Sequence, residues 1–199
     1  MEYIIVGLGN PGEKYRLTRH NAGRFILEEL TKTNWPDIKF DDWRLWKNFK
    51  AKIVAGRADQ LRFLLVLPET FMNLSGDSVN RFPQAKKNNA LLVVHDELAL
   101  PLGQFRLSFG RSAGGHNGVE SIIKSLGTPD FLRLRIGIGP KKSAGLFKLF
   151  RRPVQHKDYV LEKFTDKEIT ELKSLSPKIK EAIFLSLKEG REVAMNKFN

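Results

Sequence analysis

Two hydrophobic patterns recur along the chain, and each of them predicts strands. Continuous apolar runs such as Leu91-Leu92-Val93-Val94 are typical of strands that are buried on both faces. Runs that alternate apolar and polar residues, such as residues 132–136, place their polar groups on one face. The predicted strands cover residues 3–6, 51–55, 61–67, 91–94, 104–107 and 132–138.

Helical periodicity fills the segments between these strands. Apolar residues three and four positions apart predict helices that begin near Asn21 (as the cap), Ser75, His116 and Thr165, and a last one after Pro177 over about residues 178–195. Thr165-Asp166-Lys167-Glu168 also matches a capping box. Strands that alternate with helices predict an α/β sandwich, and the length predicts one domain over residues 1–199.

The charge of the chain changes this picture by predicting a polyanionic partner. Lysine and arginine number 34 against 22 acidic residues, which gives a formal net charge of +12. The basic residues cluster in 141–157, a segment with Gly145 and Pro153 that we expect to be a basic loop or lid. This clustering favours nucleic acid over a membrane surface, because no basic amphipathic helix with bulky apolar residues accompanies it.

Composition narrows the location and the chemistry. We expect no signal peptide, because Met1 leads almost directly into a strand, and no run approaches the length of a membrane span. The chain has no cysteine, which excludes a thiol nucleophile and fits a reducing compartment. We therefore expect a cytoplasmic protein that works through histidine, aspartate and asparagine.

Three of the four histidines lie in polar turns beside an amide or a carboxylate. They are His20 before Asn21, His95 before Asp96, and His116 before Asn117. Asp96 follows a buried strand, and α/β folds build their sites at the carboxyl ends of strands. A carboxylate there orients an imidazole and stabilises its cation, so His20 with Asp96 is a candidate acid–base pair.

The segment Gly7-Leu8-Gly9-Asn10-Pro11-Gly12 formally matches a dinucleotide-binding fingerprint. The context does not fit, because Pro11 occupies the turn, helical periodicity begins only near Asn21, and the expected acid about 20 residues on is missing. The glycines are better interpreted as a tight turn that presents Asn10.

Two other functions compete at this point. A metal-dependent hydrolase or nuclease would use His20, His95, Asp96 and His116, but the paired spacings typical of metal ligands are absent. A non-catalytic RNA-binding domain would need basic and aromatic surface, but no histidine–aspartate pair at strand ends.

Several short sequence motifs, taken together in their order along the chain, are more specific than either of these alternatives. They span residues 5–15, 18–23, 68–76, 95–103, 114–118, 133–139 and 158–161. Together they resemble the bacterial-type peptidyl-tRNA hydrolases over roughly residues 3–195. The resemblance implies a mixed, mostly parallel twisted sheet between helices in a three-layer single domain. It also implies a monomer that needs no metal, no cofactor and no obligate protein partner.

The resemblance further implies hydrolysis of the ester between a peptide, or another N-blocked aminoacyl group, and the 3′ ribose of tRNA. His20 would be the base that activates water, Asp96 would hold its basic form, and Asn10 would help to tell N-blocked from free aminoacyl groups. The other substrate-binding positions would be Tyr15, Phe71, Met72, Asn73, His116 and Asn117. The oxyanion would be stabilised by Asn10, by Asn73 or by a backbone N–H.

The basic excess then predicts a track for tRNA phosphates. Its expected members are Arg106, Arg133, Arg135, Lys141 and Lys142, with Arg151 and Arg152 as an extension. Two features depart from the family pattern. Ala99 stands where a second acid is common, and the segment 142–156 is longer and more basic than expected, with His156 not catalytic.

Overall fold

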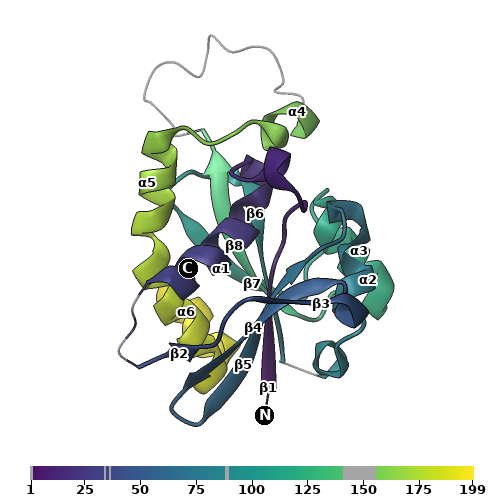
Figure 1. Cartoon of the computed structure of the whole chain (residues 1–199). Helices are drawn as coiled ribbons and strands as arrows, with labels where there is room; N and C mark the ends of the chain where they lie inside the picture. Colours follow the sequence, from purple (N-terminus) through teal and green to yellow (C-terminus); the bar gives the residue numbers. More distant parts are fainter. Residues whose placement is uncertain (1, 34, 36, 88–89, 141–155) are drawn as a thin grey trace.

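A computed structural model describes residues 2–33, 35, 37–87, 90–140 and 156–199 of the chain (Figure 1). A twisted sheet lies at its centre. Its strands are β1 (Glu2–Gly7), β2 (Lys39–Phe40), β3 (Arg44–Trp46), β4 (Ala51–Ala58), β5 (Leu61–Pro68), β6 (Leu91–Pro101), β7 (Phe105–Phe109) and β8 (Leu132–Gly139). The six predicted strands are all present.

The sheet is mixed, with a parallel centre. Its order is β2-β4-β5-β1-β6-β8-β7, and β3 pairs with β4 beside that path. Strands β5, β1, β6 and β8 run parallel to one another, whereas β2, β3, β4 and β7 join by antiparallel pairs. The carboxyl ends of β1 and β6, which are neighbours, therefore meet at one edge of the sheet.

Helices cover both faces of the sheet, so the predicted three-layer α/β architecture is confirmed (Figure 1). The helices are α1 (Ala22–Lys32), α2 (Ser75–Val79), α3 (Asn117–Leu126), α4 (His156–Leu161), α5 (Asp166–Ser174), α6 (Ser176–Lys188) and α7 (Arg191–Phe198). One core packs α1, α5 and α6 against side chains such as Ile5 and Val94. The other core packs α2 and α3 against Ile4 and Val93, which point the opposite way from the same strands.

Five short 3₁₀ helices complete the fold of the described residues. They are η1 (Glu13–Tyr15), η2 (Arg19–Asn21), η3 (Lys47–Phe49), η4 (Met72–Leu74) and η5 (Pro83–Lys86). Segments η1, η2 and η4 follow β1 and β5 at the carboxyl edge of the sheet. They therefore carry several of the candidate residues to the place where the site is expected.

The structure corrects four details of the expected elements. Asn21 does not cap α1 with its side chain, which bonds to Asn10 instead. The C-terminal helix is two helices, because Gly190, with φ of 95°, separates α6 from α7. Strand β6 extends to Pro101, well beyond the predicted Val94. Strands β2 and β3 were not predicted, because two or three residues are too short to show a period.

The expected lid over 141–157 lies almost wholly outside the described residues, which resume with α4 at His156. Lys141, Lys142, Arg151 and Arg152 fall in the same gap. Among the helices that the structure describes, none has the length and apolar character to cross a membrane.

Candidate active site

The N-terminal end of α1 packs closely on β6, and this contact positions His20. A Cβ atom on Gly23 would lie 2.1 Å from the carbonyl oxygen of Val94, so only glycine allows the helix this near to the strand. His20 lies in η2, directly before α1. The close packing therefore brings His20 over β6 just where that strand passes Val94.

Asp96, although buried, can contact His20 because β6 extends further than β1 at the carboxyl edge of the sheet. Strand β1 ends at Gly7, which pairs with Val94, whereas β6 continues beside β8 with Asp96 opposite Ile136. Asp96 thus lies beyond the end of β1, at the carboxyl edge of the sheet but within its own strand. This corrects the expectation that Asp96 stands in a turn after a strand.

Asp96 accepts hydrogen bonds from two imidazoles. His20 Nδ1 lies 2.9 Å from Oδ1 and 3.1 Å from Oδ2 of Asp96, and His116 Nε2 lies 2.8 Å from Oδ1. His116 Nδ1 accepts the backbone N–H groups of Gly118 and Val119, so its proton must be on Nε2, which donates to Asp96. The ionised Asp96 likewise favours a proton on His20 Nδ1, which leaves His20 Nε2 with a free lone pair.

Burial and charge act against each other on these groups. Burial alone lowers the pKa of His20, but the charge of Asp96 and the hydrogen bond to it outweigh burial, so the pKa ends above 6.5. Burial alone raises the pKa of Asp96, but His116 and His20 together hold it well below its usual range. Asp96 is therefore a stable carboxylate at neutral pH that orients His20.

His95 is a buried neighbour and takes no direct part in this arrangement. Its Nδ1 donates to the backbone carbonyl of Asp96 at 2.7 Å, and its ring meets that of His116 at 4.6 Å and 73°. Burial, with the nearby His116, lowers the pKa of His95 to about 3, so the ring is neutral. His95 fixes the main chain of Asp96, as expected of a structural neighbour.

Asn10 is held from three directions. Its backbone N–H and C=O bond to the side-chain amide of Asn21 at 2.8 and 2.9 Å, and its Oδ1 accepts the N–H of Met72 at 2.8 Å. With Oδ1 occupied, the Nδ2 group has no partner in the part of the chain that the structure describes. Asn10 can therefore donate to a carbonyl oxygen of a ligand.

Comparison with known proteins decides what this arrangement belongs to. A family model described as peptidyl-tRNA hydrolase matches residues 4–199. The chain belongs to the peptidyl-tRNA hydrolase family. The match covers both cores of the fold and the whole cluster around Asp96, so the resemblance drawn from separate blocks is confirmed over the length of the chain.

Individual relatives agree with the family model. The peptidyl-tRNA hydrolase of Methylacidiphilum infernorum is 39% identical over 99% of this chain and 97% of its own length. That of Carboxydothermus hydrogenoformans is 40% identical over 99% of this chain and 98% of its own. The crystal structure of the peptidyl-tRNA hydrolase from Acinetobacter baumannii superposes with a TM-score of 0.80 at 34% identity, covering 99% and 94% of the two chains.

The remaining candidate residues differ in how accessible they are. Met72 is buried against Gly118, where a Cβ would lie 2.4 Å from the methionine sulfur. Phe71 is 52% exposed and meets the ring of Tyr15 edge-on at 6.3 Å. Asn73 and Asn117 are exposed, one in η4 and one at the first residue of α3. Met72 is therefore packed inside the protein, and the other four side chains are accessible to solvent.

The three arginines of the expected phosphate track differ in burial and in the groups they contact. Arg133 is 3% exposed and donates to the carbonyls of Ser112 and Arg111, so its guanidinium is engaged inside the protein. Arg135 is partly exposed and lies 3.4 Å from Glu97. Arg106 is exposed and donates to the carbonyl of Asn199. Arg135 and Arg106 remain accessible, whereas Arg133 supports the loop before α3.

His20, Asp96 and His116 also have the geometry of a metal site, since their ligand atoms lie within 4.8 Å of one another. The hydrogen bonds argue against this use. Both ring nitrogens of His116 are engaged, one accepting backbone N–H groups and one donating to Asp96, so metal binding would require that Nε2 lose its proton. The cluster fits a hydrogen-bonded acid–base group.

Sequence reasoning missed two functional contacts. The first is the hydrogen bond from His116 to Asp96. It depends on His116 being the N-cap of α3, a position where serine, threonine, asparagine or aspartate is the usual sequence signal. Arg19 forms a two-pronged ion pair with Glu168 at 2.9 and 3.1 Å, which joins η2 to the start of α5. The position of Arg19 next to His20 could have drawn attention to it, but its partner Glu168 is 149 positions away, so no local pattern links the two residues.

Proposed function

We propose that this chain hydrolyses the ester between the peptide and the 3′ ribose of peptidyl-tRNA, with His20 as general base. The observation that carries the proposal is the pairing of His20 Nδ1 with Asp96 at 2.9 Å, which leaves Nε2 as the basic nitrogen. His20 Nε2 takes a proton from water, and the water oxygen attacks the ester carbonyl. Such general-base assistance is typically worth about 10²–10⁴-fold in rate.

The collapse of the tetrahedral intermediate completes the reaction. The bond from carbon to the ribose oxygen breaks, and the proton held on His20 passes to that oxygen, so the base is restored. Asp96 stabilises the transient imidazolium without itself gaining a proton, in keeping with its lowered pKa. The reaction needs only water and the side chains of this chain.

Asn10 is the donor that we assign to the developing oxyanion or to the adjacent peptide carbonyl. Its Oδ1 is fixed by Met72, so the Nδ2 group is directed by the protein and does not depend on the substrate. Removal of one such donor typically costs about 2.7–4 kcal/mol in the transition state. Asn73, which follows Met72, and Asn117, at the start of α3, are both exposed, and we assign them further contacts to the substrate.

The decisive experiment compares wild type with His20→Ala. Turnover of N-acetylaminoacyl-tRNA should be lost, because the neighbouring imidazole of His116 has both ring nitrogens engaged in hydrogen bonds and offers no basic lone pair, while tRNA binding should stay within about twofold. Free aminoacyl-tRNA is the control substrate and should be spared. Near-normal turnover in His20→Ala would contradict the assignment, and loss of wild-type turnover with a chelator would favour the metal-dependent alternative.

Location and assembly follow from the same proposal. Peptidyl-tRNA arises at ribosomes, so the proposed substrate places the protein in the cytoplasm. Every residue of the proposed reaction comes from one chain, and we propose that the monomer is sufficient. A mass measurement of the active species tests this point.

A further inference from the structure

A cavity borders the proposed active site at Asn10. Its volume is about 610 Å³, within the range of about 300–1,000 Å³ that is typical of ligand sites. Asn10, Leu17 and Asn21 line it, and they belong to the loop and 3₁₀ segments that also hold His20. The cavity is thus continuous with the site through Asn10.

The order of the strands shows on which side of Asp96 this cavity lies. Asp96 lies on β6, and the accessible Arg135 and Arg106 lie on β8 and β7, to one side of it. The cavity is lined by Glu69, directly after β5, and by Lys52 on β4, to the other side. An ester held over β1 and β6 would therefore have tRNA on one side and its peptide on the other.

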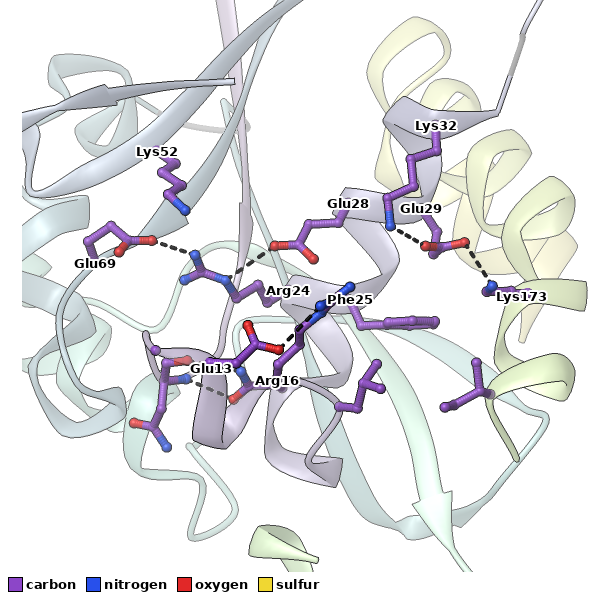
Figure 2. A pocket seen from close by; sticks show the side chains of 15 residues that line it. Glu13, Arg16, Arg24, Phe25, Glu28, Glu29, Lys32, Lys52, Glu69 and Lys173 are labelled. Carbon is purple, nitrogen blue, oxygen red and sulfur yellow. Dashed lines mark hydrogen bonds and ion pairs between the residues drawn. The ribbon is translucent and has the colours of Figure 1, made fainter. Parts of the chain in front are cut away.

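The charges of the cavity favour a peptide over a phosphate backbone. Figure 2 shows Lys52 and Glu69 on one side, Arg24 at the centre, and Glu29 with Lys173 on the other side. The lining holds four acidic residues, Glu13, Glu28, Glu29 and Glu69, interspersed with five basic ones, so it lacks the continuous positive charge that suits a phosphate backbone. A lining that mixes both signs accepts peptides of varied sequence.

Most of these charges are already paired within the protein. Arg24, which is largely buried, bonds to Glu69 and lies 3.5 Å from Glu28. The remaining pairs are Arg16 with Glu13 at 3.2 Å, Lys32 with Glu29 at 2.7 Å, and Lys173 with Glu29 at 3.8 Å. Lys52 is exposed and has no ion-pair partner among the residues that the structure describes.

We propose that this cavity receives the peptide of the substrate, and that Lys52 gives the enzyme a preference for acidic side chains in residues beyond the one esterified to tRNA. The inference rests on the proposed function and adds a specificity-determining residue to it. An acidic side chain gains the unpaired ammonium of Lys52, whereas a basic one meets only carboxylates that already have partners. A single N-acetylated glycine meets Asn10 at the near end of the cavity and brings no side chain to Lys52.

The test uses three tRNA substrates with the same glycine at the ester. N-acetylglycyl-tRNA ends at the active site, and two N-acetylated tetrapeptidyl-tRNAs carry either glutamate or lysine at the other three positions. We expect wild type to have a higher kcat/KM for the glutamate peptide, by about three- to tenfold at low salt, and a smaller ratio at high salt. The ratio is taken within one enzyme preparation, so it does not depend on the amount of folded protein.

Three variants make the result specific. Lys52→Glu should invert the ratio, and Lys52→Arg should keep it. Lys39→Glu is the matched control, because Lys39 is an exposed lysine on β2 outside the cavity, and it should behave as wild type. N-acetylglycyl-tRNA should be cleaved equally by all four proteins.

The outcomes separate this inference from the proposed function. If Lys52→Glu leaves the ratio unchanged while all substrates are cleaved, the cavity does not read the peptide and the inference is wrong on its own. An equal inversion by Lys39→Glu would also overturn it, because the effect would then come from net charge. If wild type cleaves none of the substrates, the proposed function fails and this inference fails with it.

Discussion

At the scale of single residues, the pKa of His20 is set by Asp96 against burial, and this opposition can be measured. His20 acts as a base only when neutral, so kcat/KM should fall as the pH drops through its pKa, which lies above 6.5. In Asp96→Asn, the negative charge and the charged hydrogen bond that raise the pKa of His20 are lost, whereas burial still lowers this pKa. We therefore expect the acid limb of the pH profile to move below pH 6.5, with maximal turnover reduced by about 10²–10⁴-fold.

The measurement is a pH–rate profile of wild type and Asp96→Asn with N-acetylaminoacyl-tRNA. Titration of the His20 ring by NMR in the absence of substrate gives an independent value for the same pKa. An acid limb that stays in place in Asp96→Asn would mean that another group sets the profile.

Sequence reasoning worked best for the residues of this pair. His20 and Asp96 were predicted as partners because a buried strand followed by an acid marks the carboxyl edge of a sheet. The role of His116 was missed, since its bond to Asp96 depends on which nitrogen carries the proton, and capping by Nδ1 fixes that only in three dimensions. Arg133 was misjudged because alternation along β8 suggests an exposed polar face, whereas the loop before α3 covers it.

At the scale of elements, η2 is anchored to α5 by one partly buried ion pair. The guanidinium of Arg19 lies over the rings of Tyr159 and Phe164 at 4.6 and 5.2 Å while it bonds to Glu168. Glu168 also accepts the N–H of Thr165 in the capping box that the sequence predicted. The segment that carries His20 is thus fixed by a residue that starts another helix.

We expect Glu168→Gln to lower the free energy of unfolding by about 1–3 kcal/mol, because it leaves the buried Arg19 without a countercharge. Glutamine still fits the capping box, so the loss reports the ion pair. Burial raises the pKa of Glu168, but Arg19 and Thr165 lower it further, so the wild-type contribution is present above about pH 4.5 and is lost as the pH falls below it. Turnover should fall as well, because His20 follows Arg19.

Urea unfolding of wild type, Arg19→Gln, Glu168→Gln and the double variant measures this effect. The double variant should be less destabilised than the sum of the two single variants, because each single change leaves one charge without its partner. Strictly additive losses would show that the two residues act independently. The long separation between Arg19 and Glu168 explains why no local pattern indicated the pair.

At the scale of the whole molecule, the fold class followed from the alternation of strands and helices, but the edges of the sheet did not. Strands β2 and β3 are short and largely exposed, so pairing with β4 is what defines them. The division between α6 and α7 depends on the positive φ of Gly190. A single glycine in a helical pattern is tolerated, so it does not by itself predict that the helix ends there. Tertiary context decided each of these features.

The excess of 12 positive charges makes a last prediction possible, because only accessible charges release counterions from tRNA. Each phosphate that is neutralised should contribute about 0.7–0.9 log units of affinity per decade of salt.

Arg106 is exposed, so Arg106→Gln should reduce the slope of log affinity against log salt concentration by about that amount. Arg133 is engaged by backbone carbonyls, so Arg133→Gln should destabilise the protein and leave the slope of the folded fraction unchanged. Filter binding of tRNA between low and high salt distinguishes the two, and a reduced slope in Arg133→Gln alone would mean that the buried guanidinium, not the exposed one, meets the phosphates.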